Sequence, residues 1–490
     1  AVHGLVNVIW AQPVTGESRV SVSASTLERL RADGVLFGDY ENGSGRLAAS
    51  YMAEAGWRDN TGSTQAKLSV VRQMQLGEWD VTAWAAASAL QQETAGFIEG
   101  EKAYRDRDIA TGNPNPEAYR DAYSARMAVS MERALSGDSS IRLTPFVRWQ
   151  EMEFSQHFLP NGGVEDNGHT GAGLMARYET QISDRVELTV GGDLDFARGY
   201  LREVQLEPFG FFPGDSRFPQ GIHYDYTVET QMGAVWAELD YALMDNFRVL
   251  AGLRGETHDY SYETDAPVGI NGRFNVVANR SDEFSFVTPK FGAIWYAWDD
   301  VSIYANYARG ARAPQASDLY RLQAEQNAGE VEVETLDSLE IGARGSALDG
   351  RFLYDVAAYA MDKDNFYFRD SDRLNVPNGS SRHVGLEGQG AFDLTDTLTL
   401  QGNVSWSEQT YTFTRVTGSA SETITDGNEI DTAPEWLGDV SVIWAPDDAF
   451  EVQVSAEYVG EYFTNPANTR SYPGHTLTNV RAAYEFENGI

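Results

Sequence analysis

The chain has 490 residues, with 37 basic and 73 acidic side chains and a formal net charge of −36. This acidity disfavours a nucleic-acid partner, because a phosphate backbone requires clustered Lys and Arg. The absence of cysteine excludes disulfides, thiolate catalysis and metal sites built on Cys. No stretch approaches the roughly 20 apolar residues of a transmembrane helix, whereas membrane-crossing strands carry only a weak alternation and stay possible.

The pattern along the chain is that of strands. Aromatic residues make up 12% of the chain, and 46 Gly stand against 16 Pro. In residues 186–196 the apolar side chains, such as Leu188 and Leu194, alternate with polar ones, such as Asp193 and Asp195. Successive side chains of a strand point to opposite faces, so this segment has one apolar and one polar face. Residues 452–458 and 480–486 repeat the pattern, and residues 25–32 are the one short helical candidate.

Tight-turn signals recur at a mean spacing of about 49 residues, a period that repeat folds also use. Between successive turns lie longer polar stretches, at 91–123, 156–170, 199–226, 257–283 and 407–434. The turn signals are Asn42-Gly43, Gly77-Glu78, Gly137-Asp138, Ser183-Asp184, Asp245-Asn246, Asp299-Asp300, Asp349-Gly350, Thr395-Asp396, Asp447-Asp448 and Asn488-Gly489.

Short turns at one end of the strands and long loops at the other are typical of an outer-membrane barrel. We therefore predict an all-β fold, a transmembrane antiparallel up-and-down β-barrel with about 20 strands. Aromatic residues near the short turns, among them Trp79, Trp298 and Trp444, are expected to form a girdle at the membrane interface. The alternative is a soluble β-propeller, whose blades have a similar period but four short strands each.

Residues 302–314 read SIYANYARGARAP and continue into SDLY at 317–320. This segment resembles the strand-and-loop signature of TonB-dependent outer-membrane receptors, and residues 286–292 and 336–345 look like the neighbouring strands of that family. Residues 1–9 are similar to the last strand of the family's plug domain. The resemblance implies that residues 1–14 end a plug, and that residues 15–490 form about 20 strands of a 22-stranded barrel. The last two strands, most of the plug and the TonB box are then expected outside this sequence.

The resemblance also implies a function. It indicates a receptor in the outer membrane of a Gram-negative bacterium, surrounded by outer-membrane lipid and energised by the TonB complex of the inner membrane. Its ligand would be scarce, of the ferric siderophore, cobalamin or oligosaccharide class. The first alternative is a passive diffusion porin, although porins usually have 16–18 strands. A propeller enzyme is a further one, but we find no nucleophile–base arrangement or phosphate-binding glycine loop and expect no enzyme.

Candidate ligand residues lie in one aromatic loop and on one strand. The loop offers stiff apolar rings and a guanidinium, and the strand offers two cations for the lumen. The alternatives are that the loop packs its own aromatics, and that the strand cations pair with wall carboxylates. No histidine pattern supports a metal site, and no cofactor is expected. The candidates are Phe209, Phe211, Phe212, Arg217 and Tyr224 in the loop, and Arg309 and Arg312 on the strand.

Overall fold

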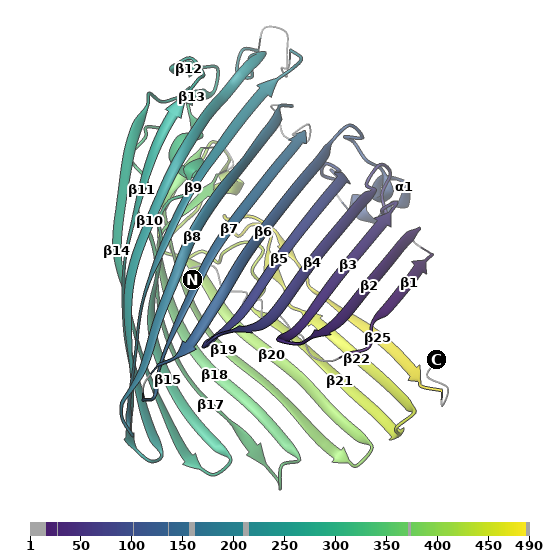
Figure 1. Ribbon diagram of the computed structural model, residues 1–490. Helices are drawn as coiled ribbons and strands as arrows, with labels where there is room; N and C mark the ends of the chain where they lie inside the picture. Colours follow the sequence, from purple (N-terminus) through teal and green to yellow (C-terminus); the bar gives the residue numbers. More distant parts are fainter. Residues whose placement is uncertain are drawn as a thin grey trace.

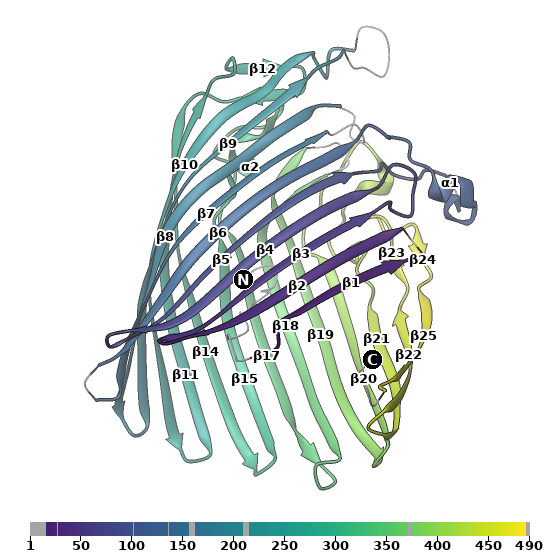
Figure 2. The same ribbon diagram turned by 45° about the vertical axis from the view of Figure 1, so that its right-hand side comes forward.

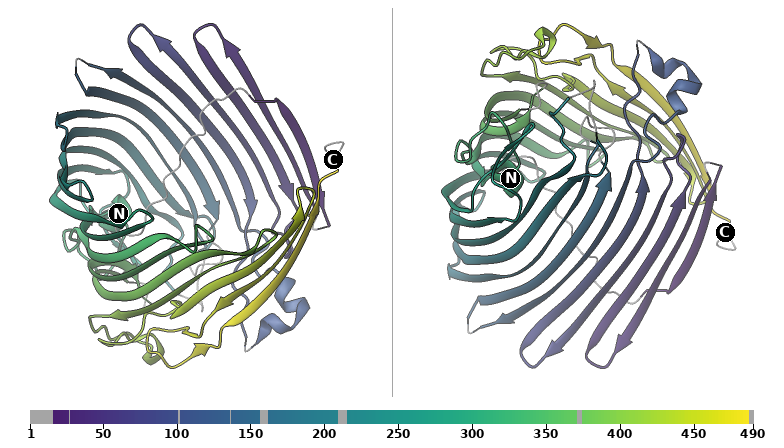
Figure 3. Two further views of the ribbon diagram at one scale, coloured as in Figure 1. Left: turned by 90° about the horizontal axis from the view of Figure 1, so that it is seen from below. Right: turned by 90° about the horizontal axis from the view of Figure 1, so that it is seen from above.

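The computed structural model describes residues 16–486 except 27, 101, 136, 156–161, 209–214 and 371–373. Within these residues, twenty antiparallel strands form one sheet that curves into a barrel-shaped wall (Figure 1 and Figure 3). Each strand of this sheet pairs with the next one along the chain, from β1 with β2 to β22 with β25. The predicted all-β barrel of about 20 strands is therefore confirmed.

The strands of the wall are β1 (Arg19–Ser25), β2 (Arg29–Tyr40), β3 (Gly43–Glu54), β4 (Ser63–Leu76), β5 (Trp79–Glu93), β6 (Tyr119–Ala134), β7 (Ser139–Ser155), β8 (Val164–Ser183), β9 (Val186–Gln205), β10 (Gly221–Met244), β11 (Phe247–Thr264), β14 (Arg280–Trp298), β15 (Val301–Arg312), β17 (Glu334–Ala347), β18 (Phe352–Arg369), β19 (Asn375–Thr395), β20 (Leu398–Tyr411), β21 (Trp436–Asp447), β22 (Phe450–Val459) and β25 (His475–Tyr484). The remaining elements lie in the connections. They are η1 (Ala103–Arg105), α1 (Arg107–Thr111), β12 (Gly269–Asn271), β13 (Phe274–Val276), α2 (Ala316–Tyr320), β16 (Leu322–Gln323), η2 (Ala420–Glu422), β23 (Tyr462–Phe463) and β24 (Ser471–Tyr472). None of the helices in the described part of the chain is long and apolar enough to cross a membrane.

The predicted short turns are confirmed along the described chain. Gly77-Glu78 joins β4 to β5, Asp245-Asn246 joins β10 to β11, and the other signals up to residue 448 lie likewise between paired strands. The last signal, Asn488-Gly489, lies outside the described residues, as does the predicted plug segment 1–14. The helical candidate at 25–32 is wrong, because β1 ends at Ser25 and β2 begins at Arg29.

The ends of several stretches predicted as long loops are strand instead. In the predicted loop 199–226, β9 continues to Gln205 and β10 already begins at Gly221. β10 has 24 residues, whereas crossing the membrane takes roughly 9–11. Figure 2 shows the wall rising higher along β8 to β11 than along β21 to β25. Above the lipid both faces of a strand meet water, so the apolar–polar alternation that identifies a strand disappears there.

The two faces of the wall differ in chemistry. On β9, Leu194 and Phe196 point outward and are about half exposed, while Asp193 and Asp195 point inward and hold ion pairs. The outward face of β10 carries Val235, whose exposed fraction is 71%. An apolar outer face and a polar lumen are what a lipid-embedded barrel requires, so the predicted orientation of the faces is confirmed.

Val70→Lys and Ser69→Lys test this assignment at neighbouring positions of β4. Val70 belongs to the outward face and Ser69 to the lumen face, beside the small residues Ala48 and Ala86. We expect Val70→Lys to lower the free energy of unfolding by about 2–4 kcal/mol, because a lysine then meets hydrocarbon, and Ser69→Lys to change it by less than about 1 kcal/mol. Urea titrations of the protein in lipid vesicles measure both. Equal losses for the two variants would contradict the assignment.

Candidate ligand site in the lumen

Ion pairs line the lumen face of the wall. Arg148 of β7 reaches across β8 to Asp195 of β9, with distances of 2.5 and 2.7 Å from its terminal nitrogens to the carboxylate oxygens. Gly171 lies beneath this guanidinium, and a Cβ there would come within 3.1 Å of Arg148 Cζ and 3.0 Å of the Phe196 carbonyl oxygen. Glycine at this position therefore keeps the path of the arginine open.

Further cations of the lumen are held in the same way. Arg254 pairs with Asp193, and Lys290 pairs with Glu238. The buried carboxylate of Glu334 forms ion pairs with Arg312 and Lys363, each at 2.7 Å. The cations that a negatively charged ligand would contact in this part of the lumen are thus already in ion pairs with carboxylates of the wall.

An aromatic core packs against the inside of the wall near its outer mouth. Its rings contact one another, as Tyr262 and Tyr320 do with centroids 4.3 Å apart. The core joins strands β9, β10 and β11 to the connections that carry β13 and α2, so it fixes those connections on the lumen side. Its buried members are Leu201, Phe218, Tyr224, Tyr226, Val228, Tyr260, Tyr262, Ala266, Phe274, Val276, Leu319, Tyr320 and Val331.

Buried charges lie beside this core. Arg321, which follows α2, pairs with Glu165 of β8 at 2.6 Å and with Glu203 of β9. Burial alone would lower the pKa of the Arg321 guanidinium, but the two carboxylates outweigh it and raise the pKa above its ordinary value. Burial also raises the pKa of Asp318 in α2. Its carboxylate accepts a hydrogen bond from the backbone N–H of Gln315 at 2.9 Å.

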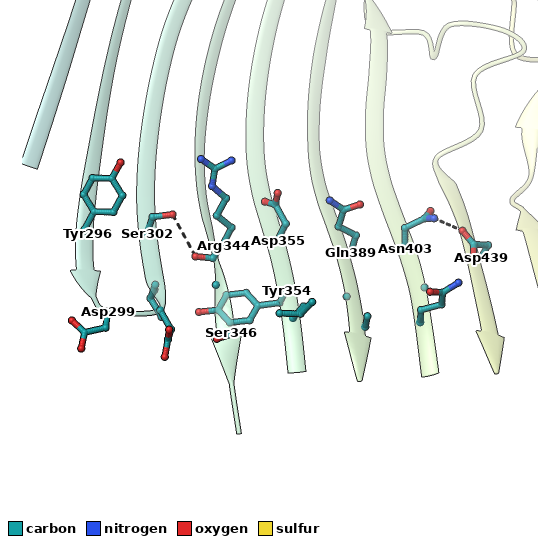
Figure 4. A pocket seen from close by; sticks show the side chains of 18 residues that line it. Tyr296, Asp299, Ser302, Arg344, Ser346, Tyr354, Asp355, Gln389, Asn403 and Asp439 are labelled. Atoms are coloured by element: carbon teal, nitrogen blue, oxygen red, sulfur yellow. Dashed lines mark hydrogen bonds between the residues drawn. The ribbon is translucent and has the colours of Figure 1, made fainter. Parts of the chain in front are cut away.

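A second region of the lumen lies nearer the short turns. Directly paired residues on six adjacent strands form one row across the wall there (Figure 4). They line a hollow of about 900 Å³ together with Asp299 and Asp300 of the β14–β15 turn. Within the described part of the chain, no carboxylate pairs with the Arg344 guanidinium, in contrast to the cations higher up. The row consists of Ser302, Arg344, Asp355, Gln389, Asn403 and Asp439.

The structure separates the residues predicted for the aromatic loop. Phe209, Phe211 and Phe212 lie outside the described residues. The Arg217 guanidinium pairs with Asp215 at 2.7 Å, and Tyr224 is buried with its hydroxyl donating to the Leu322 carbonyl at 2.5 Å. Phe218, Tyr224 and Tyr226 thus pack as a core, the alternative raised for this loop. Ligand contact by these residues stays a prediction.

The two strand arginines lie on opposite faces of β15. Arg312 faces the lumen, whereas Arg309 is directly paired with Asp337, on the same outward face as the exposed Leu339 and Ile341. The expectation that both arginines bring charge to the lumen is therefore wrong for Arg309, because three residues along a strand reverse the face. Both arginines pair with carboxylates, Arg309 with Asp337 at 2.5 Å and Arg312 with Glu334. Pairing with wall carboxylates was the alternative role predicted for them.

Sequence reasoning missed the buried charges and the polar row. Glu165 and Glu203 fall in stretches predicted as loops, where the sequence pattern assigns no face to a side chain. Extending the alternation of β9 from Asp193 through Asp195 would have placed Glu203 on the same inward face. No comparable signal marks Arg321, because its position follows from the fold of the β15–β17 connection. Among the described residues, no group of three or more His, Cys, Asp or Glu side chains is arranged to hold a metal ion.

A continuous ladder of twenty strands that curves around a wide polar lumen and carries an apolar outer face defines an outer-membrane barrel of the transport class. The family model described as TonB dependent receptor-like, beta-barrel, matches residues 23–490. The chain belongs to this family and resides in the outer membrane of a Gram-negative bacterium, as the resemblance implied.

Known proteins agree with this assignment. The ferric-pyoverdine 358 receptor of Pseudomonas putida is 24% identical over 232 residues, which cover 46% of this chain and 26% of that protein. The match thus spans about a quarter of the relative's length. The siderophore receptor PiuA of Acinetobacter baumannii has a TM-score of 0.75 at 14% identity, over 97% of this chain and 76% of that one. The ferric citrate transporter FecA has a TM-score of 0.76 at 14% identity, over 95% and 70%. These two structures support the fold.

Arg312→Met and Arg309→Met should differ in their effect on stability. Removing Arg312 leaves the buried Glu334 with Lys363 as its remaining cation, so the free energy of unfolding should fall by about 1–3 kcal/mol. Removing the more exposed Arg309 should lower it by less than about 1 kcal/mol. Denaturant titration in detergent micelles compares the two variants. A larger loss for Arg309→Met would contradict the assigned faces.

Proposed function

We propose that this protein is a receptor that captures a ferric chelate of the siderophore class at the cell surface and imports it with energy from the TonB complex. The observation that carries the proposal is membership of the TonB-dependent receptor family over almost the whole chain. The ferric-pyoverdine receptor among its relatives supports a ferric chelate as ligand. Cobalamin and oligosaccharides are the alternative ligands. Family membership favours an energised receptor over a passive porin.

The lumen suits such a role. Its upper wall is lined by paired charges and backed by a rigid aromatic core, so a ligand meets a surface that is already ordered before it binds. Preordered sites lose little conformational entropy on binding, which favours capture of a dilute ligand. The side chains that are free to contact the ligand would come from the outer connections and from the upper lumen face.

Binding and uptake by the whole protein test the proposal. We expect tight binding of a ferric siderophore such as ferric pyoverdine, and uptake by cells that stops when an uncoupler collapses the proton motive force. Calorimetry with the ferric siderophore, the iron-free siderophore, cobalamin and an oligosaccharide measures the preference, and radioactive iron measures the uptake. Uptake that persists after uncoupling, or a steadily open channel in planar bilayers, would support the porin instead.

We further propose that a plug domain occupies the lower lumen in the whole protein. A lumen this wide cannot be filled by wall side chains, and transporters of this size carry a plug there. The row from Ser302 to Asp439 supports this location, since it presents amides, carboxylates and the Arg344 guanidinium to an open hollow. A polar partner surface could form hydrogen bonds with these groups without displacing an existing ion pair.

Arg344→Glu in the whole protein should loosen the plug. The reversed charge would repel groups that had paired with Arg344, so channel openings in planar bilayers should become more frequent by about tenfold, equivalent to about 1.4 kcal/mol. Arg382→Glu is the matched control, because Arg382 lies on the outward face of β19 and is more than half exposed. Openings that increase equally in both variants, or in neither, would contradict the assignment of this surface to the plug.

A further inference from the structure

The β3–β4 and β5–β6 connections form one ordered unit at the outer ends of their strands. We call this unit the loop pair, and it consists of the described residues of 55–62 and 94–118. Arg58 joins the two connections. Its Nε and one terminal nitrogen donate to the Gly112 carbonyl at 3.0 and 2.8 Å, and its other terminal nitrogen donates to the Gly96 carbonyl at 3.1 Å. These hydrogen bonds hold the two connections together.

Further hydrogen bonds complete the loop pair. Asn113 donates to the Asn60 carbonyl at 3.0 Å and to the Thr94 carbonyl at 3.2 Å, so it also joins the two connections. Within the β5–β6 connection, Asp106 caps α1 by accepting from the backbone N–H of Asp108 at 3.1 Å. The loop pair is therefore ordered by hydrogen bonds and does not need a large apolar core of its own.

Large apolar side chains of the loop pair are exposed. Their exposed fractions range from 48% for Ile109 to 72% for Phe97. Apolar surface in contact with water is unfavourable, and an exposed apolar patch marks an interaction surface. Because the backbone around these side chains is already ordered, the surface is present before any partner arrives. The exposed side chains are Trp57 in the β3–β4 connection, Phe97, Tyr104 in η1 and Ile109 in α1.

The loop pair lies on a low part of the wall. Figure 1 shows the outer ends of the strands stepping down from β9 to β1. β3, β4 and β5 have 12, 14 and 15 residues, compared with 24 in β10. Crossing a membrane takes roughly 9–11 residues, so only a short part of these strands extends beyond the lipid. α1 projects outside the ring of strands (Figure 2 and Figure 3). The loop pair thus begins near the membrane surface and extends away from the lumen.

The apolar outer face of the wall leads to the loop pair. Outward residues of β5 and β6 pair directly, Ala85 with Met127 and, further out, Ala89 with Tyr123. The first two residues line an apolar hollow of about 380 Å³ on the lipid face. β5 ends at Glu93, soon after Ala89, and the β5–β6 connection begins there. The lipid interface of the wall is therefore continuous with the loop pair.

The exposed side chains are of the kinds found at membrane surfaces. Trp and Tyr are enriched where hydrocarbon meets water, and arginine reaches from there toward the headgroups. The Arg58 guanidinium lies 5.9 Å from the centroid of the Trp57 ring, and that of Arg105 lies 5.7 Å from the Tyr104 ring. Residues 105–108 read Arg-Asp-Arg-Asp, so their charges cancel. Apolar contact, more than attraction to anionic headgroups, would hold this unit on lipid.

We propose that the loop pair is a lateral anchor whose exposed apolar side chains enter the outer-leaflet lipid at its interface with water. The partner is the lipid surface, because the loop pair continues the lipid face of the wall and extends outside the ring of strands. The anchor holds this low part of the rim at the membrane surface and keeps both connections away from the lumen. It depends on the outer-membrane location of the barrel and not on the ligand proposed above.

Spin labels on the whole protein in phosphatidylcholine vesicles measure the depth of the loop pair. The chain has no cysteine, so Ile109→Cys places a single label in the loop pair. Val268→Cys, an exposed site in the β11–β14 connection of the high flank, is the matched control. Power saturation compares access by oxygen, which concentrates in lipid, with access by a water-soluble nickel chelate. We expect the label at residue 109 about 5–10 Å below the lipid surface and the label at residue 268 in water.

The other two results would overturn the proposal. If the nickel chelate reaches the label at residue 109 as easily as the label at residue 268, the loop pair lies in water. If neither reagent reaches the label at residue 109, protein covers the loop pair, either another part of the chain or a second copy. Repeating the measurement at a lower ratio of protein to lipid distinguishes these two kinds of cover.

Removing the aromatic rings tests whether they hold the loop pair in place. Trp57→Ser together with Phe97→Ser should move the label at residue 109 toward water by about 5 Å. Val268→Ser together with Ile270→Ser is the matched control, since it removes two exposed apolar side chains from another outer connection. This control should leave the depth unchanged. An unchanged depth without the two rings, or an equal shift in the control, would overturn the proposal.

A label on Val70→Cys, on the lipid face of β4, shows whether the wall of each variant is intact. Its depth should stay the same in all of them. If the double substitution disturbs the wall, Tyr104→Ser replaces it, because this change leaves the Arg58 hydrogen bonds in place. Tyr104→Ser should shift the label at residue 109 toward water as well. No shift in this variant would overturn the proposal.

Discussion

A backbone that crosses hydrocarbon has no water to satisfy its amides and carbonyls, and this constraint governs the whole molecule. The wall meets it by pairing each strand with its sequence neighbour over most of its length, as β9 and β10 do from Val186 to Gln205. Once every strand is committed to this ladder, side chains can point only to lipid or to the lumen. The alternation of Leu194 and Phe196 with Asp193 and Asp195 follows directly from it.

The lumen that results has two chemically different zones. In the upper zone, cations of the lumen are paired with carboxylates, and the aromatic core and the ion pairs of Arg321 with Glu165 and Glu203 fasten residues 316–326 to the wall. In the lower zone, Arg344 and the amides of Gln389 and Asn403 face an open hollow. The first arrangement favours a fixed shape, because its groups have already exchanged water for protein partners. The second favours association, because its groups can still form such contacts.

The barrel could be predicted because turn residues and the period of two are local properties. Gly77-Glu78 and Asp245-Asn246 each mark a turn by themselves, and the faces of β9 are readable from a short segment. The sequence also allowed the prediction that Arg309 and Arg312 point to opposite faces of their strand, since an odd number of residues separates them. The cluster that Arg321 forms with Glu165 and Glu203 was not readable in this way. It brings together residues separated by more than a hundred positions, Glu203 and Arg321, through a connection whose path depends on how Tyr320 packs on Tyr262.

The strands differ in length around the wall, from 24 residues in β10 to 10 in β22 and β25 and 7 in β1. The outer rim of the barrel is consequently oblique. It is high along β8 to β11 and low along β21 to β25 (Figure 2). The outer opening is therefore tilted toward the low flank formed by β21 to β25.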